Sequence, residues 1–387
     1  MDANHRRQFN AEWTPAKYAD FLRRLDSGSG THVGFRNCET PCFFPKAIVE
    51  KMAAYGRELT DQLTRSTEYR KLSDATIPDK FRVANEDNLP LFVQADFGLD
   101  EHYQPKLVEI QAFPSLYAYQ PFLAETYRAA YDVDPALTYY LDGLDEASYR
   151  ELLRDAVVGK QDPENVILME IHPEQQKTLA DFLLTEKMLG IRTVCVTKIR
   201  QKGRCLTYEH EGRTIPIHRI YNRVIVDEMI RKNVTAGFDI RADLDVEWAG
   251  HPNWYFRISK FSIPYLKHVS VPKTWFLDRL EDVPADLENY VLKPLYSFAG
   301  LGVVVGPTKA DIDAVPSAQR SHYILQERIN FVPVIETPHG PTKAEIRVMY
   351  IGTRAVTTIT RMGRGKMMGV DQNKNMEWVG ASAAFVI

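Results

Sequence analysis

The sequence predicts a mixed α/β (α+β) protein built from several packed lobes, and three features of the chain carry this prediction. The chain has 387 residues, which is more than a single hydrophobic core comfortably fills. A strand–helix–strand pattern between residues 165 and 196 is typical of a parallel sheet. The last third of the chain is a series of strands separated by polar turns.

The N-terminal region is predicted to be largely helical over residues 15–70. Apolar residues recur there at nearly helical spacing, which is typical of a buried helix face: Ile48, Val49, Met52, Leu59 and Leu63.

A β-hairpin is predicted next. Residues 91–97 and 106–111 have strand composition, and the polar residues 98–104 form the turn between them. Helices are expected to follow at 121–131 and 147–157.

The middle and the end of the chain complete the prediction. The middle segment contains, in order, a strand at 165–169, a helix at 174–189 that ends at Gly190, a strand at 193–196, a hairpin around Glu211-Gly212 and a strand at 219–224. The final strands are expected at 290–293, 302–306, 323–329, 344–351 and 354–361. We therefore expect three regions, at 1–155, 160–250 and 265–387.

Composition excludes several functional classes. The net charge of -3 and the pI near 6.4 give no electrostatic reason to expect nucleic acid or an anionic membrane as a partner. No apolar run reaches the roughly 18–20 residues of a transmembrane helix, and the N-terminus lacks the apolar segment of a signal peptide. Four cysteines are too few for a disulfide framework. We expect a cytoplasmic protein, and the sequence leaves its oligomeric state open.

A lysine and a glycine-containing loop give the strongest local signal. In YVLKPLYSFAGLGVV (290–304), a strand ends at Lys293, the loop contains Ser297, Gly300 and Gly302, and a second strand returns. Glycines let backbone N–H groups approach phosphate oxygens, and lysine adds a positive charge. The alternative interpretation is a hairpin with a loose turn and a surface lysine. The strand that follows at 323–329 carries Gln326 and Glu327. Its extended backbone can present N–H and C=O groups for hydrogen bonds with the edge of an adenine.

These motifs together resemble the nucleotide-binding half of the ATP-grasp superfamily. The resemblance implies that Lys293 and an upstream lysine, Lys273, contact phosphates and that the Gln326-Glu327 strand lies by the adenine. It also implies that Arg347 and Arg361 face the nucleotide. Arg361 suits a bidentate contact with the transferring phosphoryl group, and the alternative places it at the start of an exposed basic loop.

The order of the motifs resembles circularly permuted ATP-grasp proteins such as glutathionylspermidine synthase. Those ligases carry a Glu-x-Asn strand that holds Mg²⁺, and LVEIQAF (107–113) resembles it early in this chain. The resemblance implies a metal site of Asp96, Glu109 and Gln111, with a small βαβ lobe at 160–250. The alternative interpretation is a hairpin with two solvated acids.

The chain departs from the family's pattern at three places. Gln111 replaces the family's Asn, Gln94 replaces an arginine, and the loop Ser297-Phe298-Ala299-Gly300 lacks the family's charged residues.

The resemblance implies an ATP- and Mg²⁺-dependent ligase that joins a small-molecule carboxylate to an amine or a thiol through an acyl phosphate. Two alternatives are a small-molecule kinase on the same scaffold and a nucleotide-binding regulatory protein without catalysis. Gln111 and the uncharged glycine loop favour the regulatory alternative.

Overall fold

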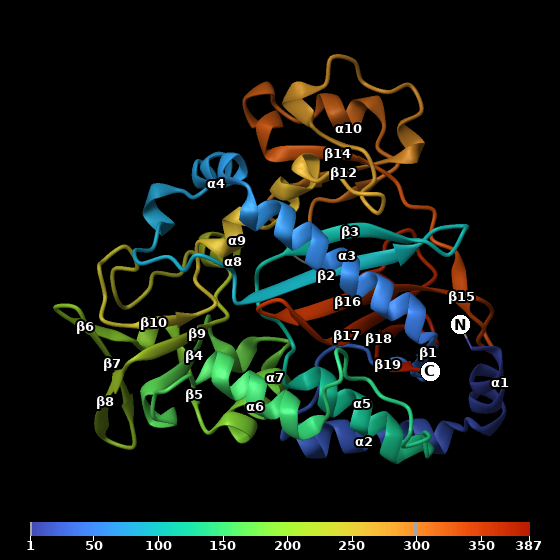
Figure 1. The fold of residues 1–387 in the computed structure, drawn as a ribbon, viewed down its shortest axis with the longest axis horizontal. Helices are drawn as coiled ribbons and strands as arrows, with labels where there is room; N and C mark the ends of the chain where they lie inside the picture. The colour runs from blue at the N-terminus through green and yellow to red at the C-terminus, as the bar shows by residue number, and fades with distance from the viewer. Residues whose placement is uncertain (1, 298–299) are drawn as a thin grey trace.

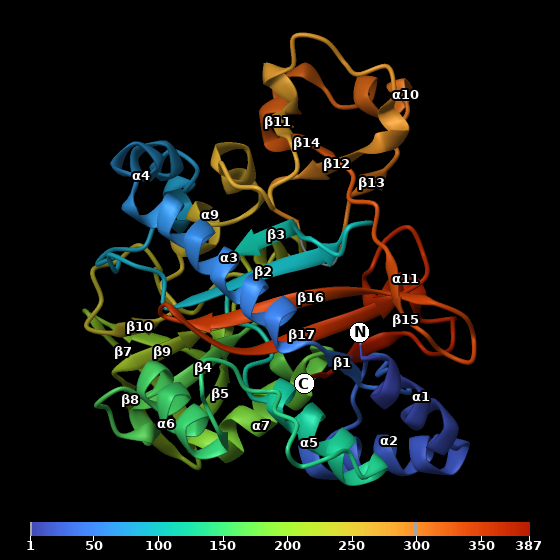
Figure 2. The ribbon, with the colours of Figure 1, turned by 45° about the vertical axis from the view of Figure 1, so that its right-hand side comes forward.

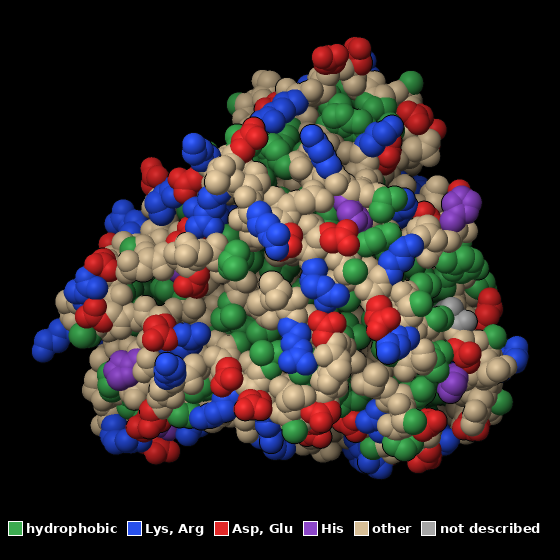
Figure 3. All heavy atoms as spheres, viewed as in Figure 1, with side chains coloured by type: hydrophobic (Ala, Val, Ile, Leu, Met, Phe, Trp, Pro, Cys, Tyr) green, Lys and Arg blue, Asp and Glu red, His purple; other side chains and the backbone are tan. Residues whose placement is uncertain are grey.

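The structure is a computed structural model that describes residues 2–297 and 300–387. Figure 1 shows a central sheet with a smaller sheet above it, a parallel sheet at the lower left and helices at the lower right, where both termini lie. Within the described residues, no helix has the length and apolar character needed to cross a bilayer. Acidic and basic side chains are interspersed over the face shown in Figure 3, as the small net charge leads one to expect.

The central sheet is antiparallel and joins strands from distant parts of the chain. Its spatial order is β18 (Gly380–Ser382), β17 (Arg354–Gly363), β16 (Thr342–Ile351), β2 (Phe92–Leu99) and β3 (Pro105–Gln111), and β15 (Pro333–Ile335) also pairs with β16. The predicted hairpin at 91–111 is therefore confirmed. It lies beside the C-terminal strands, because β2 pairs with β16 along seven residue pairs.

Helix α3 (Lys46–Arg65) crosses one face of the central sheet, as Figure 1 shows. Side chains alternate along a strand, so every second residue of β2 and β16 faces this helix. The resulting apolar layer contains Val49, Met52, Leu59 and Leu63 of the helix and Val93, Ala95, Phe97, Ile346 and Val348 of the sheet.

The predicted helical region at 15–70 is interrupted, which corrects the sequence interpretation. Helix α2 (Pro15–Ser29) ends at Gly30, which adopts the left-handed conformation of a C-cap. Strand β1 (Cys42–Phe44) then pairs in parallel with β19 (Ala384–Val386). A partner strand so remote in sequence leaves no periodic signal near β1. Helices resume with α3 and α4 (Thr67–Asp74).

The parallel sheet confirms the predicted strand–helix–strand unit. Its order is β10 (Glu247–Ala249), β9 (Arg219–Asn222), β4 (Val166–Glu170) and β5 (Arg192–Cys195). Helix α7 (Leu179–Leu189) ends at Gly190 as expected, but it begins later than predicted because a 3-10 turn, η3 (Pro173–Gln175), and an extended Gln176 precede it. The predicted hairpin is present in a meander of β6 (Arg200–Lys202), β7 (Cys205–His210) and β8 (Arg213–Ile217).

A third sheet, here called the upper sheet, stands above the β3 edge of the central sheet (Figure 2). Its order is β11 (Thr274–Phe276), β14 (Tyr323–Glu327), β12 (Tyr290–Pro294) and β13 (Val304–Val305), all antiparallel. It has its own small core, which includes Leu277, Leu292, Ile312 and Leu325. The predicted strands at 302–306 and 323–329 are thus shorter than expected.

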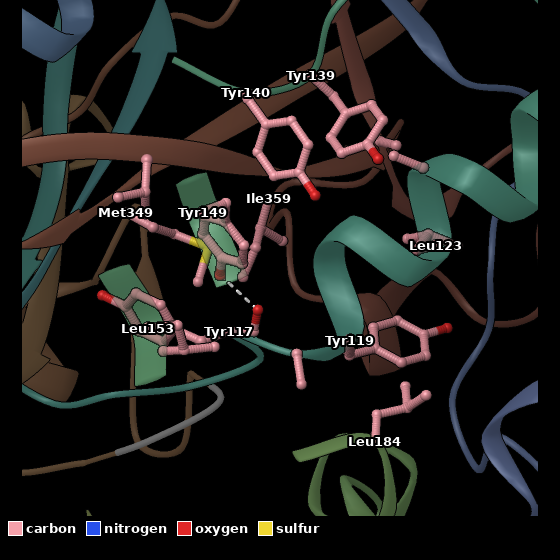
Figure 4. Close-up of a cluster of buried hydrophobic side chains, with 14 of the residues drawn as sticks. Tyr117, Tyr119, Leu123, Tyr139, Tyr140, Tyr149, Leu153, Leu184, Met349 and Ile359 are labelled. Atoms are coloured by element: carbon pink, nitrogen blue, oxygen red, sulfur yellow. Dashed lines mark hydrogen bonds between the residues drawn. The ribbon is translucent and has the colours of Figure 1, made fainter. Parts of the chain in front are cut away.

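The remaining helices pack below and around the sheets. They are α1 (Ala3–Glu12), α5 (Tyr119–Tyr131), α6 (Glu146–Val157), α8 (Val226–Arg231), α9 (Trp254–Arg257), α10 (Lys309–Asp313) and α11 (Val370–Asn373). Figure 4 shows the core that joins α5 and α6 to the central sheet, where the Tyr149 hydroxyl donates to the carbonyl of Tyr117 at 2.5 Å. Tyr117 and Tyr119 are therefore core residues.

Gly56 of α3 allows the closest approach between this helix and the central sheet. A Cβ atom at position 56 would lie 2.1 Å from the Tyr350 hydroxyl, which donates to the carbonyl of Ala53 at 2.9 Å. We predict that Gly56→Ala lowers the free energy of unfolding by about 1–3 kcal/mol, although alanine is the better helix former. Chemical denaturation measures the change.

The control is Gly34→Ala, because a Cβ atom there meets nothing nearer than 3.8 Å. Unchanged or raised stability of Gly56→Ala would contradict the packing described for α3.

Candidate functional site

The face of the central sheet that points away from α3 carries polar and charged side chains. Val93, Ala95 and Phe97 of β2 face α3, so the alternate residues Gln94 and Asp96 face the other side. Asp96 lies directly opposite Glu109 of β3 and opposite Arg347 of β16. Cross-strand partners share one face of a sheet. Asp96 and Glu109 are therefore neighbours across the hairpin.

Asp96 is buried between two arginines. Arg347 donates from Nε to Asp96 Oδ1 at 2.5 Å and from Nη2 to Oδ2 at 2.7 Å. Arg361 of β17 donates from Nη2 to Asp96 Oδ2 and to Glu345 Oε1 of β16. The third donor of Arg347, Nη1, binds Gln94 Oε1 at 3.0 Å. Two acids and two arginines therefore form one ion-paired network across three strands.

This network changes the titration of its acids. Burial alone would raise the pKa of Asp96, but the guanidinium groups of Arg347 and Arg361 outweigh burial and hold that pKa below its usual range. Burial raises the pKa of Glu345, and the pairing with Arg361 opposes that shift only in part. The two arginines therefore favour the ionised form of Asp96.

A buried lysine lies next to Glu109 at the edge of the network. Lys260 begins the 3-10 turn η5 (Lys260–Tyr265), and its Nζ lies 3.6 Å from Glu109 Oε1. The same Nζ donates to the carbonyl oxygen of Ser297 at 2.7 Å. Lys260 thus links the central sheet to the start of the glycine-containing loop of the upper sheet.

Lys293 comes to the same place from β12. Its Nζ donates to the carbonyl of Val108 at 3.1 Å and to Gln326 Oε1 at 2.5 Å. Burial lowers its pKa to about 8, while the negative charge of Glu109 acts in the opposite direction. The two sheets therefore meet at two lysines, Lys260 and Lys293, with Glu109 between them.

Two buried polar groups beside these lysines have no hydrogen-bond partner among the described residues. They are the Nε2 atom of Gln326, a residue that is 2% exposed, and the Oγ atom of Ser297. Buried polar atoms in folded proteins are nearly always paired. An amide N–H and a hydroxyl next to two ammonium groups would be satisfied by a polar, anionic ligand.

The glycine-containing loop packs against a second loop that follows β17. Gly300 and Gly302 have φ of +73° and +72°, and a Cβ atom at position 300 would lie 2.5 Å from Met367 Cε. The second loop is organised by Asn373, whose amide bonds the backbone of residues 364, 365, 367 and 369. Asn373 therefore stabilises the turns of this second loop. Phe298 and Ala299 of the glycine loop lie outside the described residues.

Lys273 and Glu327 lie apart from this arrangement. The Lys273 side chain is 75% exposed, and its Nζ is 3.7 Å from Glu327 Oε1 at the edge of the upper sheet. The structure places Lys260, and not Lys273, beside Lys293. Lys260 was not predicted from the sequence, because it stands among serines and an arginine in RISKFSIPY and has no motif around it.

The residues predicted to hold Mg²⁺ do not fit that ion as they are arranged. Mg²⁺ needs oxygen ligands at about 2.0–2.1 Å in octahedral geometry. Both oxygens of Asp96 already accept from guanidinium groups. The Gln111 amide lies 3.0 Å from Gln94 Oε1 and 3.1 Å from Arg347 Nη1, so either orientation is engaged by protein. The described residues contain no group of three potential ligands of His, Cys, Asp or Glu type.

The buried charge of Lys293 has a measurable consequence for stability. Between its folded pKa of about 8 and its unfolded value of 10.5, the unfolded chain holds this proton and the folded chain does not. Stability therefore rises with pH through this window. We predict that unliganded wild type gains about 2 kcal/mol relative to Lys293→Met between pH 7.5 and 9.5. Urea unfolding at both pH values measures the difference.

Lys273→Met is the matched control, since its exposed ammonium should give no such trend. Parallel pH profiles for wild type and Lys293→Met would contradict the burial of a charged lysine at this position.

Comparison with known proteins supports the overall fold. No protein-family model and no curated protein sequence matches this chain. A glutathione synthetase-like effector from Globodera pallida superposes with a TM-score of 0.56 at 11% identity over 96% of both chains. A protein described as a gamma-glutamylcysteine synthetase from Methylobacillus flagellatus aligns over 86% of both chains at 12% identity with a TM-score of 0.35. The first likeness, at its low identity, establishes a shared mixed α/β fold along nearly the full length of the chain.

Proposed function

We propose that the junction of the central and upper sheets binds ATP, and that the chain is an ATP-dependent ligase. The proposed reaction joins a small-molecule carboxylate to an amine or a thiol. The observation that carries this proposal is the pair of buried lysines, Lys260 and Lys293, beside the unpartnered Gln326 Nε2 and Ser297 Oγ. Burying two ammonium groups is unfavourable unless anions compensate them, and Glu109 supplies one negative charge for two positive charges, so a polyphosphate would supply the rest.

The arrangement of the strands supports a circularly permuted ATP-grasp architecture. The hairpin of β2 and β3, from the first third of the chain, lies in one sheet with β16 and β17 from the last third. Lys293 and the glycine-containing loop then face that sheet from above. The superposition with a glutathione synthetase-like protein over nearly the full chain is compatible with this architecture and with ligase chemistry.

The reaction has two steps. A substrate carboxylate oxygen attacks the γ-phosphorus and ADP leaves; an amine or thiol then attacks the acyl carbon and phosphate leaves, with loss of the nucleophile's proton. Such phosphoryl transfer depends mainly on positioning and charge neutralisation. Lys260 and Lys293 would neutralise the nucleotide phosphates. Arg361, oriented by Asp96 and Glu345, would contact the transferring group. Because the carboxylates do not fit Mg²⁺ as arranged, no step is assigned to a metal.

One observation favours a second candidate function. Asp96 is fully engaged by Arg347 and Arg361. A site of this kind suits nucleotide binding without ligation, as in a regulatory protein. The ligase and the regulatory protein would share the nucleotide site, but only the ligase would turn ATP over. Measuring ADP release with a carboxylic acid and an amine added together therefore separates them. If ATP binds and no acid–amine or acid–thiol pair stimulates ADP release, the regulatory function replaces the ligase.

The nucleotide site itself is tested by removing one lysine at a time. We predict that Lys293→Met and Lys260→Met each weaken ATP binding by about tenfold or more, because each deletes a charge-assisted contact to phosphate. Isothermal titration calorimetry measures the dissociation constants.

Lys273→Met serves as the control and should change the affinity by less than about twofold, since its ammonium is solvated. Strong weakening by Lys273→Met together with no effect of Lys260→Met would move the phosphates to the position that the sequence alone predicted.

A further inference from the structure

The site predicted to hold a metal already contains positive charge from the protein itself. Arg347 makes a bidentate contact with Asp96, and its remaining donor binds Gln94. Every N–H-bearing nitrogen of this guanidinium is thus committed to holding Asp96 and its neighbour in place. A dication brought to Asp96 would have to displace these hydrogen bonds in a buried setting and would lie beside Arg361 as well.

Without Asp96, the predicted metal site keeps one carboxylate, that of Glu109. Glu109 lies 3.6 Å from the ammonium of Lys260, and the Gln111 amide is engaged by Gln94 or Arg347. Together with the two lysines and Glu109, the network makes a site of seven charged side chains. Four are cations, Lys260, Lys293, Arg347 and Arg361, and three are carboxylates, Asp96, Glu109 and Glu345. The protein part of the site is therefore positively charged before any ligand enters.

Arg361 retains hydrogen-bonding capacity toward a ligand. Only its Nη2 is used, by Asp96 and Glu345, and its Nε and Nη1 donate no hydrogen bond among the described parts of the chain. A guanidinium fixed at one nitrogen and open at the others presents the fork that phosphate oxygens fit. A more negatively charged form of the nucleotide suits this site better than one already neutralised by a metal.

We propose that this chain binds ATP in its metal-free form, with the Arg361 guanidinium facing the phosphates at the place where Mg²⁺ is otherwise expected. Arg347 neutralises Asp96 and so removes the carboxylate that would recruit the metal. This inference rests on the proposed nucleotide site and deepens it. It assigns the discrimination between the metal-free and metal-bound nucleotide to a single ion pair, Asp96 with Arg347.

Calorimetric titration of ATP into the full chain, once in EDTA and once in excess Mg²⁺, tests the proposal. The expected result is a dissociation constant for ATP in EDTA that is no more than about threefold higher than in Mg²⁺. Binding that is more than about threefold weaker in EDTA would overturn the metal-free site while leaving the proposed nucleotide site intact. Absence of ATP binding under both conditions would instead overturn the proposed function and this inference with it.

Arg347→Gln provides the second arm. This change releases Asp96 from its bidentate partner, so ATP binding should now be favoured by Mg²⁺ by about tenfold relative to EDTA. Arg354→Gln is the matched control, because Arg354 lies at the other end of the β16–β17 hairpin and donates to the Asp142 carbonyl. Circular dichroism establishes that both variants are folded. An unchanged ratio in folded Arg347→Gln would contradict the role given to the ion pair.

Discussion

The buried carboxylate of Asp96, held between two guanidinium groups, is the interaction on which the site depends. It ties β2 to β16 and, through Arg361, to β17. Removing one member of such a pair leaves an uncompensated buried charge, which costs about 3–5 kcal/mol. The network therefore constrains the register of β2 and β16 and the directions of the Arg347 and Arg361 side chains.

The same network underlies the proposals that the site is positively charged and that it binds the nucleotide without a metal. Two unit charges about 4 Å apart interact by roughly 4 kcal/mol at an effective dielectric constant near 20, and a dication doubles that repulsion. The two guanidinium groups thus offset the attraction that the carboxylates of Asp96 and Glu345 would exert on Mg²⁺. Lys260 and Lys293 add further positive charge where the sheets meet. The unpartnered Gln326 Nε2 and Ser297 Oγ beside these lysines do not serve stability, and they are part of the basis for the proposed ligand site.

Much of the fold could be predicted because its signals are local. The alternation of Val93, Gln94, Ala95 and Asp96 marks a half-buried strand, and Gly190 marks the end of α7. Glu211 and Gly212 both have positive φ in the turn between β7 and β8, as the sequence of that hairpin suggested. The prediction missed β1, because this strand pairs with β19 at the other end of the chain. Nothing in the sequence near Cys42 distinguished the strand from the neighbouring helices.

The candidate site shows the same division. The sequence by itself predicted that Lys293 lies at the end of a strand before a glycine-containing loop and that residues 91–111 form a hairpin, because both follow from local sequence patterns, while the pairing of Asp96 with Glu109 came from the family resemblance. Only the tertiary structure decided that Asp96 pairs with Arg347 and Arg361, that Lys260 lies beside Lys293, and that Lys273 stays in solvent. The physical reason is that a side chain's electrostatic partners depend on the pairing and register of strands far apart in sequence. Local periodicity carries no information about that pairing.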